Sequence, residues 1–338
     1  MHIRPAVAAA LGAALSLIAA PAAAQRYEAV GTRAHGMAGA FVAVTDDASA
    51  TWWNPAGLAT GAYFSALFER LEETDPADAP AVGPASERRT SGFAIAYPAL
   101  GLSYYRFRIS DMRPSTAADD LAREDQGVPR VDLRSRAVSE YGATIGQSVG
   151  GALVISSTLK LVRAGEVESA GEAPEGSLDR AADADVPRHT RGDIDVGALV
   201  SFPHARIGLS VKHLNEPTFG DGDDRFELSR QVRAGVALFG RGAPGFDRIT
   251  GAVDADLTTT ETAIGEVRHV AAGVEAWLLG RRLGVRAGIS ANTVAQKGRP
   301  TSAGVSVGAG SGLYLEGALT VGSDRSRKGA AVGLRMAF

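Results

Sequence analysis

The side chains that could carry out chemistry are few and scattered. The six histidines are His2, His35, His189, His204, His213 and His269. No two of them lie four residues apart, as a helical zinc site requires. His269 and Ser290 would suit a barrel phospholipase only if both faced the outer wall. The sequence GAGSG at 308–312 joins two expected strands, so it reads as a turn and not as a phosphate loop. With no cysteine either, we expect no enzymatic activity, no cofactor and no bound metal.

Charged residues are more numerous, and many recur on one face of segments with alternating hydrophobicity. Lys and Arg number 35 against 38 Asp and Glu, a balance that predicts no nucleic-acid partner. We assign the basic members of this set to the inner wall of a lumen: Arg106, Arg108, Arg134, Arg136, Lys160, Lys212, Arg233, Arg286 and Arg335. The acidic members are Glu140, Asp193, Asp195, Asp254, Asp256, Glu275 and Glu316. These charges could pair with a plug or simply solvate a polar lumen.

The N-terminus has the pattern of a secretory signal peptide. Arg4 precedes an apolar run from Ala6 to Ala20, and Ala22–Ala24 supplies small residues for cleavage near Ala24. We expect residues 1–24 to be removed. The apolar run is shorter than the roughly 20 residues that span a bilayer as a helix.

The remaining chain divides into segments of about ten residues with a period of two, which is typical of a transmembrane barrel. We place fourteen strands near 61–72, 89–98, 100–110, 131–149, 151–164, 191–202, 205–214, 225–239, 247–258, 266–279, 281–291, 301–309, 312–321 and 329–338. In one of them, Leu153, Ile155, Leu159 and Leu161 alternate with polar residues. A soluble sandwich would alternate in the same way.

The lengths of the connections favour the membrane barrel. Long polar connections alternate with tight turns such as Pro98–Ala99 and Gly150–Gly151, as in barrels with short periplasmic turns and longer outer loops. The last strand ends on Phe338, which resembles the signal read by the barrel-assembly machinery of the outer membrane. We therefore predict an all-β, fourteen-stranded antiparallel barrel over 61–338, in contact with outer-membrane lipid. Its location would be the outer membrane of a Gram-negative bacterium.

Fourteen strands enclose more space than wall side chains fill, so we expect residues 25–60 to form a hatch, or plug, in the lumen. Its glycines Gly31, Gly36 and Gly39 would let the backbone approach the wall. Asp46 and Asp47 would then need cationic partners, which we expect from the basic wall residues. The other candidate hatch and ligand residues are Phe41, Trp52, Trp53, Asn54 and Pro55. Asn54 and Pro55 are expected to turn the chain toward the wall, whereas the tryptophans could touch a ligand, anchor the hatch or lie in an interfacial belt.

The stretch GMAGAFVAVTDDASATWWNPAG resembles the N-terminal hatch of the FadL family of outer-membrane transporters for hydrophobic compounds, and equally the start of the PorV family. KHLNEPTF at Lys212–Phe219 is also similar to a PorV segment. Resemblance to FadL implies passive transport of small, fatty-acid-like molecules. Resemblance to PorV implies a barrel that binds a secretion partner and does not conduct, and a purely structural barrel is a third reading. The polar outer loops and the short chain depart from FadL, whose outer loops are long and apolar and gather ligand.

Overall fold

A computed structural model of the chain describes residues 30–75, 85–114, 130–172, 184–220, 225–240, 244–262, 265–294, 298–310, 312–322 and 327–338. Fourteen antiparallel strands form one closed barrel, in which β1 pairs with β18 to complete the ring. The first seven are β1 (Ser65–Asp75), β2 (Ala85–Tyr97), β3 (Leu100–Pro114), β4 (Arg130–Val149), β5 (Leu153–Glu172), β6 (His189–Ser201) and β7 (Ala205–Lys212). The others are β10 (Gln231–Gly240), β11 (Phe246–Asp256), β14 (His269–Leu278), β15 (Leu283–Asn292), β16 (Thr301–Gly308), β17 (Leu313–Val321) and β18 (Lys328–Ala337). The barrel predicted from hydrophobic alternation is confirmed.

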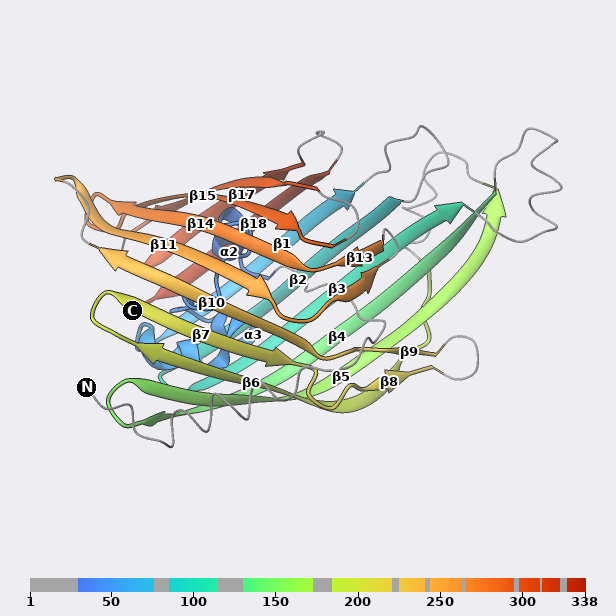
Figure 1. Ribbon diagram of the computed structural model, residues 1–338, viewed down its shortest axis with the longest axis horizontal. Coiled ribbons are helices and arrows are strands. Elements are labelled where there is room, and N and C mark those ends of the chain that lie inside the picture. The colour runs from blue at the N-terminus through green and yellow to red at the C-terminus, as the bar shows by residue number, and fades with distance from the viewer. Residues whose placement is uncertain are drawn as a thin grey trace.

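Turns between strands are short at one end of the barrel, on the left in Figure 1. Two residues join β2 to β3, and three join β4 to β5 and β6 to β7. The connections at the opposite end are longer, and two of them carry small hairpins. These are β8 (Thr218–Phe219) with β9 (Phe226–Glu227), and β12 (Thr260–Thr262) with β13 (Gly265–Val267). We call the two ends of the barrel the short-turn end and the long-connection end.

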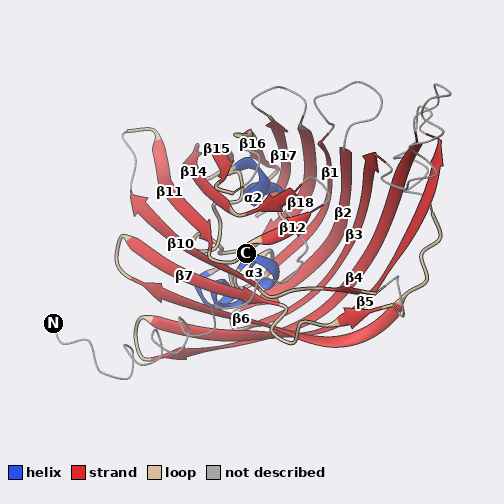
Figure 2. Cartoon of the chain, turned by 45° about the vertical axis from the view of Figure 1, so that its right-hand side comes forward, coloured by secondary structure: helices blue, strands red, loops and turns tan. Residues whose placement is uncertain are grey.

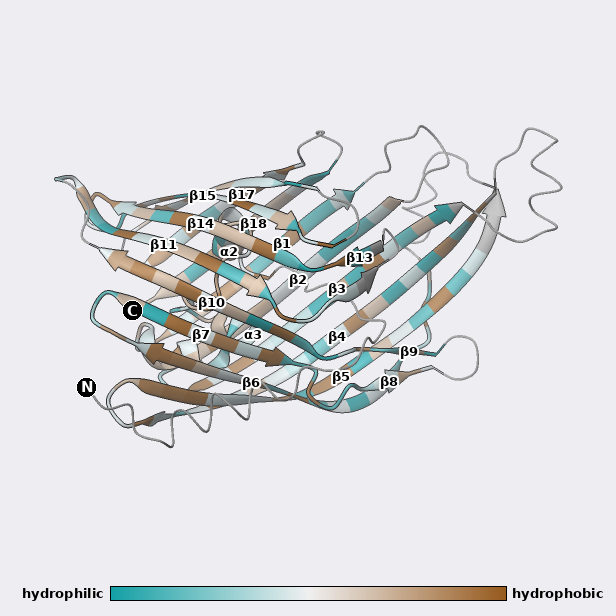
Figure 3. Ribbon diagram, viewed as in Figure 1, coloured by the Kyte–Doolittle hydropathy of each residue, from teal (hydrophilic) through white to brown (hydrophobic). Residues whose placement is uncertain are grey.

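Apolar side chains cover the outward face of the wall. Leu102, Ile145, Leu159 and Leu315 are among the large hydrophobic residues that stay exposed, although each lies within a long strand. Many of their inward neighbours are polar or small, so the strands alternate along much of their length in Figure 3. No helix in the described part of the chain is long and apolar enough to cross a membrane.

Residues 30–60, which belong to the segment predicted as the hatch, lie inside this ring. They contain the helices α2 (Thr32–Gly36) and α3 (Ala50–Trp53) and the 3-10 helix η1 (Pro55–Thr60). Figure 2 looks past the strands onto α2 and α3 within the barrel. Helix α2 packs on β15–β18, whereas η1 packs on β2 and β4–β6, so the hatch reaches opposite sides of the wall. Residues 61–64 connect the hatch to the wall, and β1 begins at Ser65. The predicted signal peptide, residues 1–24, lies outside the described residues.

The predicted inward orientation of Arg106 and Arg108 is wrong. Both lie on the outward face of β3, because Arg106 is opposite Ser91 and Ser139 while the adjacent Tyr105 is opposite Glu140 on the inner face. The inner positions of this strand are instead occupied by aromatic rings, including Tyr105 and Phe107, which are buried. Sequence alternation identifies two faces but not which of them is inner. In β3, the inner positions hold the aromatic rings that contact Trp52 of the hatch. The outward face of β3 continues past its apolar segment, and Arg106 and Arg108 lie in that continuation.

Candidate functional site: the hatch and the lumen

A cluster of ion pairs around Arg33 holds the hatch at the short-turn side of the lumen. The Arg33 guanidinium lies 2.7 Å from Asp46, 2.6 Å from Asp47 and 2.8 Å from Glu275 of β14. Glu275 also pairs with Arg286 of β15 at 2.7 Å. Arg33 and Glu275 are both nearly inaccessible to solvent. A network this buried is stable only while every member keeps its partner.

The cations expected to neutralise Asp46 and Asp47 were therefore assigned wrongly. Within the described residues, Asp46 pairs with Arg33 of the hatch and with Arg248 of β11, at 3.3 Å for the latter. Asp47 pairs with Arg33 and accepts a hydrogen bond from the Ser49 hydroxyl. Arg33 belongs to the hatch sequence. Its short separation in sequence from Asp46 and Asp47 is the feature that could have identified it as their partner.

These contacts set the charge states of the hatch. Burial by itself raises the pKa of Asp46, but the guanidinium groups of Arg33 and Arg248 outweigh it and lower that pKa below its ordinary value. Burial opposes the charge of Arg33 as well, yet Glu275, Asp46 and Asp47 together raise its pKa. The hatch thus carries these groups in their ionised forms at neutral pH.

Two wall carboxylates hold the hatch through its backbone. Asp254 of β11 accepts hydrogen bonds from the amides of Phe41 and Val42, both at 2.7 Å. Glu69 of β1 accepts from the amide of Gly31 at 2.7 Å and from that of Thr32 at 3.0 Å. Since these acceptors belong to strands on different sides of α2, they fix the hatch backbone relative to the wall.

Asn54 links the hatch to the wall and starts η1. Its side-chain oxygen accepts from the Ala56 amide, and its amide group donates to the carbonyls of Val42 and of Ala198 in β6, both at 3.1 Å. Pro55 follows at the first position of η1, where it replaces no needed donor. A Cβ on the wall residue Gly197 would lie 2.8 Å from the Pro55 ring, so only glycine permits this approach.

The aromatic residues of the hatch pack with each other and with the wall. Phe41 lies edge-on to Trp53 with ring centres 6.1 Å apart, and the Trp53 indole donates a hydrogen bond to the Val30 carbonyl. Trp52 packs on the inward rings of Tyr105 and Phe107. All three hatch aromatics are buried. Trp53 also lines a cavity.

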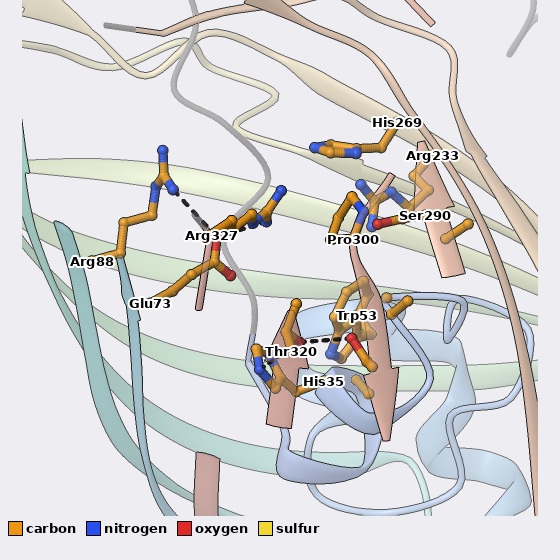
Figure 4. Close-up of a pocket in the computed structure, with 15 residues that line it drawn as sticks. His35, Trp53, Glu73, Arg88, Arg233, His269, Ser290, Pro300, Thr320 and Arg327 are labelled. Carbon is orange, nitrogen blue, oxygen red and sulfur yellow. Dashed lines mark hydrogen bonds and ion pairs between the residues drawn. The ribbon is translucent and has the colours of Figure 1, made fainter. Parts of the chain in front are cut away.

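That cavity, of about 70 Å³, lies on the side of α2 nearer the long-connection end. Its lining is shared between the hatch (Ala34, His35, Ala38, Gly39 and Trp53) and the wall (Glu73, Arg88, Arg233, His269, Ala271, Ser290, Pro300, Ser302, Thr320 and Arg327). Figure 4 shows Glu73 between Arg88 and Arg327, and Thr320 in contact with His35. Arg327 lies 2.6 Å from Glu73, and His35 Nε2 lies 3.0 Å from the Thr320 hydroxyl.

His35 forms the floor of this cavity in a neutral state. Burial lowers the pKa of His35 below its ordinary value; Glu73 acts in the opposite direction and Arg327 in the same one. The lining of the cavity therefore combines charged wall residues with the neutral imidazole, the Trp53 ring and small hatch residues.

A second polar cluster lies on the opposite wall, around Lys160 of β5. Its ammonium is 2.8 Å from Asp195, 3.0 Å from Asp193 and 3.3 Å from Glu140. His213 Nδ1 lies 2.7 Å from Asp193. Asp193, Asp195 and His213 have the ligand types and spacing of a metal site. The Lys160 ammonium already occupies the space between these carboxylates and supplies one positive charge to them.

The other wall residues singled out from the sequence separate into two groups. Arg233, Arg286, Glu316 and Lys212 are buried inward residues beside the hatch, and the Lys212 ammonium lies over the Trp52 ring. Arg134 and Arg136 also face inward but lie nearer the long-connection end, where they pair with Glu166 and Glu168 of β5. They do not contact the described part of the hatch through any ion pair.

Comparison with known proteins identifies a family for this chain. The family described as "F plasmid transfer operon, TraF, protein" matches residues 64–256, which is more than half of the chain. No curated protein matches the sequence.

Solved structures of similar shape have low sequence identity to this chain. The toluene transporter TbuX of Ralstonia pickettii is 12% identical with a TM-score of 0.59, over 93% of this chain and 99% of its own. The monoaromatic hydrocarbon channel CymD is 12% identical with a TM-score of 0.62, over the same 93% and 99%. A FadL homologue of Pseudomonas aeruginosa is 11% identical with a TM-score of 0.56, over 90% and 97%. The FadL-like resemblance inferred from the hatch sequence is thus confirmed at the level of the fold, while the PorV resemblance stays a prediction.

Proposed function

The chain belongs to the family of the F plasmid transfer operon TraF protein, and on that premise we propose that it is an outer-membrane barrel for passive transport of small hydrophobic, fatty-acid-like molecules. The observation that carries the proposal is a closed fourteen-stranded barrel whose lumen holds a hatch with a cavity beside it; the hatch is covalently joined to the wall through β1. The short-turn end would face the periplasm and the long-connection end the exterior. TbuX and CymD, which share the fold, are a transporter and a channel by description and not enzymes.

The size of the cavity implies that the hatch must move during transport. An apolar cavity of about 150 Å³ is known to accept benzene, which is roughly twice the 70 Å³ present here. A monoaromatic ring or an alkyl chain would therefore enter only if α2 shifted away from the wall. Because α2 has five residues and is held against the wall by packing, hydrogen bonds and ion pairs, none of which belongs to the strand ladder, such a shift requires no unfolding of the barrel.

A reversible lock on α2 tests this proposal. A Cβ on Gly36 would lie 3.1 Å from the Cα of Gly304 in β16, so the pair Gly36→Cys and Gly304→Cys is close enough to form a disulfide after small adjustments. The chain has no other cysteine to interfere. Flux of toluene and of lauric acid into proteoliposomes would be measured for the double variant in its oxidised and its reduced state. Each single variant and the natural sequence would serve as controls.

Flux that disappears on oxidation and returns on reduction supports transport past a moving α2. Equal flux in both states contradicts the proposed route. Absence of flux from every folded form contradicts transport altogether.

That last result would favour the second candidate, a barrel that binds a protein partner and does not conduct. The observation in its favour is that ion pairs, rather than an apolar channel, line both sides of the hatch, as the Arg33 and Lys160 clusters do. The family description names a transfer operon, which also supports a role beside other proteins.

A further inference from the structure

The outer wall carries a pocket that the transport proposal does not use. It has a volume of about 440 Å³, within the range of small-molecule sites. Its lining comes from the outward faces of β1–β3 and from residues 184–188, which we call the strap: Arg70, Arg89, Thr90, Ser91, Arg106, Arg108, Ala184, Asp185 and Arg188. Five guanidinium groups and one carboxylate therefore line the same pocket.

The strap crosses the outside of the barrel, and this position closes the pocket. Arg108, which faces outward, donates a hydrogen bond to the carbonyl of Ala184. Gly165 faces outward on β5, and a Cβ there would lie 3.1 Å from the Val186 side chain. Val186 is 3% exposed, so the strap is packed against the wall.

The pocket adjoins the apolar part of the wall on the side of the long connections. An outward aromatic row runs through Phe68, Phe93, Tyr104 and Tyr141, with neighbouring ring centres 6.0, 5.9 and 4.8 Å apart. Aromatic rows of this kind lie at the interface between hydrocarbon and head groups. The next outward positions toward the long-connection end are Arg70, Ser91 and Arg106. The arginines therefore begin where lipid head groups begin, about 7 Å along the strand from the rings.

The charges of the pocket are incompletely compensated. Arg70 pairs with Glu72 at 2.6 Å, and Arg89 pairs with Glu87 at 2.8 Å. Arg106 is exposed, and in the described part of the chain its side chain makes no hydrogen bond or ion pair. Arg188 presents a buried Nε that lacks a hydrogen-bond partner among the described residues. Among the described residues, counting Glu72, Glu87 and Asp185 against the five arginines leaves an excess of positive charge.

We propose that this pocket binds the phosphate of a phosphorylated lipid in the outer leaflet of the membrane. Guanidinium groups match phosphate oxygens with two parallel hydrogen bonds, and the aromatic row would contact the acyl chains of the same lipid. The lipid head group would lie between the wall and the strap, and Arg106 and Arg188 would donate to its phosphate. The proposal rests on the outer-membrane placement but not on transport, so a barrel without flux would leave it intact.

Binding of a phosphorylated lipid to the purified full chain tests this site. Lipid A with two phosphates would be titrated into detergent-solubilised protein, beside dephosphorylated lipid A and inorganic phosphate, with native mass spectrometry as the readout. Arg106→Gln and Arg188→Gln are the test variants. Lys328→Gln is the matched control, because Lys328 is an exposed residue near the same end of β18 and outside the pocket.

We expect each test variant to bind diphosphorylated lipid A about tenfold more weakly, the effect of losing a charge-assisted hydrogen bond, while Lys328→Gln binds normally. Dephosphorylated lipid A should bind weakly to every form, and addition of salt should weaken the phosphate-dependent part. Equal affinity for lipid A with and without phosphate would overturn the proposal, as would unchanged affinity in both test variants. Inorganic phosphate that competes at equal concentration would identify free phosphate, rather than lipid, as the ligand.

Discussion

Removal of the Arg33 guanidinium should open the hatch while the barrel stays closed. Arg33→Met retains much of the side-chain volume but leaves Asp47 and Glu275 without a buried cation that lay within 2.8 Å of each. Loss of one partner from a buried ionic network costs about 3 to 5 kcal/mol. Glu275 would keep Arg286, and Asp46 would keep Arg248, so we expect the lower value.

A cost of about 3 kcal/mol corresponds to roughly a hundredfold rise in the open fraction of the hatch, since about 1.4 kcal/mol is a factor of ten. Hydrogen–deuterium exchange of the amides in α2 would report this rise, and planar-bilayer conductance would report the resulting leak. Exchange in the barrel strands should not change, because their ladder hydrogen bonds do not involve Arg33.

Arg70→Gln is the matched control, because Arg70 forms an exposed ion pair with Glu72 on the outer wall. Exposed pairs contribute about 0 to 1 kcal/mol, so this variant should leave α2 exchange near that of the natural sequence. If Arg33→Met and Arg70→Gln gave the same exchange in α2, the ion-pair cluster would not be what holds the hatch.

Other predictions concern close packing, pH and the second polar cluster. Gly288→Ala should destabilise the docked position of α2 by about 1 to 3 kcal/mol, because the new methyl group would lie 2.6 Å from the backbone carbonyl oxygen of Met37. Gly251→Ala is the control: its methyl group would contact nothing, so amide exchange in α2 should not change. The lowered pKa of Asp46 stabilises the docked hatch above the ordinary value of about 3.9 and loses this effect as the pH falls through the lowered value. The protection factors of the hatch amides, which correct for the intrinsic pH dependence of exchange, should therefore differ between the natural sequence and Asp46→Asn by a constant amount from neutral pH to about 4, and by less below it. A difference that disappears near neutrality would contradict this assignment. Lys160→Ala should convert its cluster into a divalent-metal site, because the remaining carboxylate and imidazole groups suit a metal; a purified variant with no more zinc than the natural sequence would refute this.

Movement of α2 would connect the two sides of the hatch. The cavity lies toward the long-connection end, whereas the Arg33 cluster lies toward the short-turn end, and α2 contributes to both through His35 and Arg33. A ligand that displaced His35 from Thr320 would therefore act on the helix that carries Arg33. This arrangement gives a physical route by which occupancy of the cavity could loosen the seal.

The sequence by itself determined the barrel. Alternation with a period of two, tight turns at Pro98–Ala99 and Gly150–Gly151, and the alternation of long and short connections are local signals. They fix the number of strands and their direction because each strand needs only its own residues and the next turn to be recognised. The glycine-rich stretch before Ser65 likewise identified the hatch sequence through its resemblance to FadL.

The tertiary structure alone decided which charges meet and which face of β3 is inner. Arg33 and Glu275 are 242 residues apart and become partners only when the ring closes around the hatch. Arg106 lies on the outward face of β3 because Tyr105 and Phe107, which contact Trp52, occupy the inner positions. Alternation in the sequence does not indicate which face of a strand is the inner one. The outer arginine pocket exists for the same reason: its walls are three neighbouring strands and a strap from a distant connection, which no local pattern brings together.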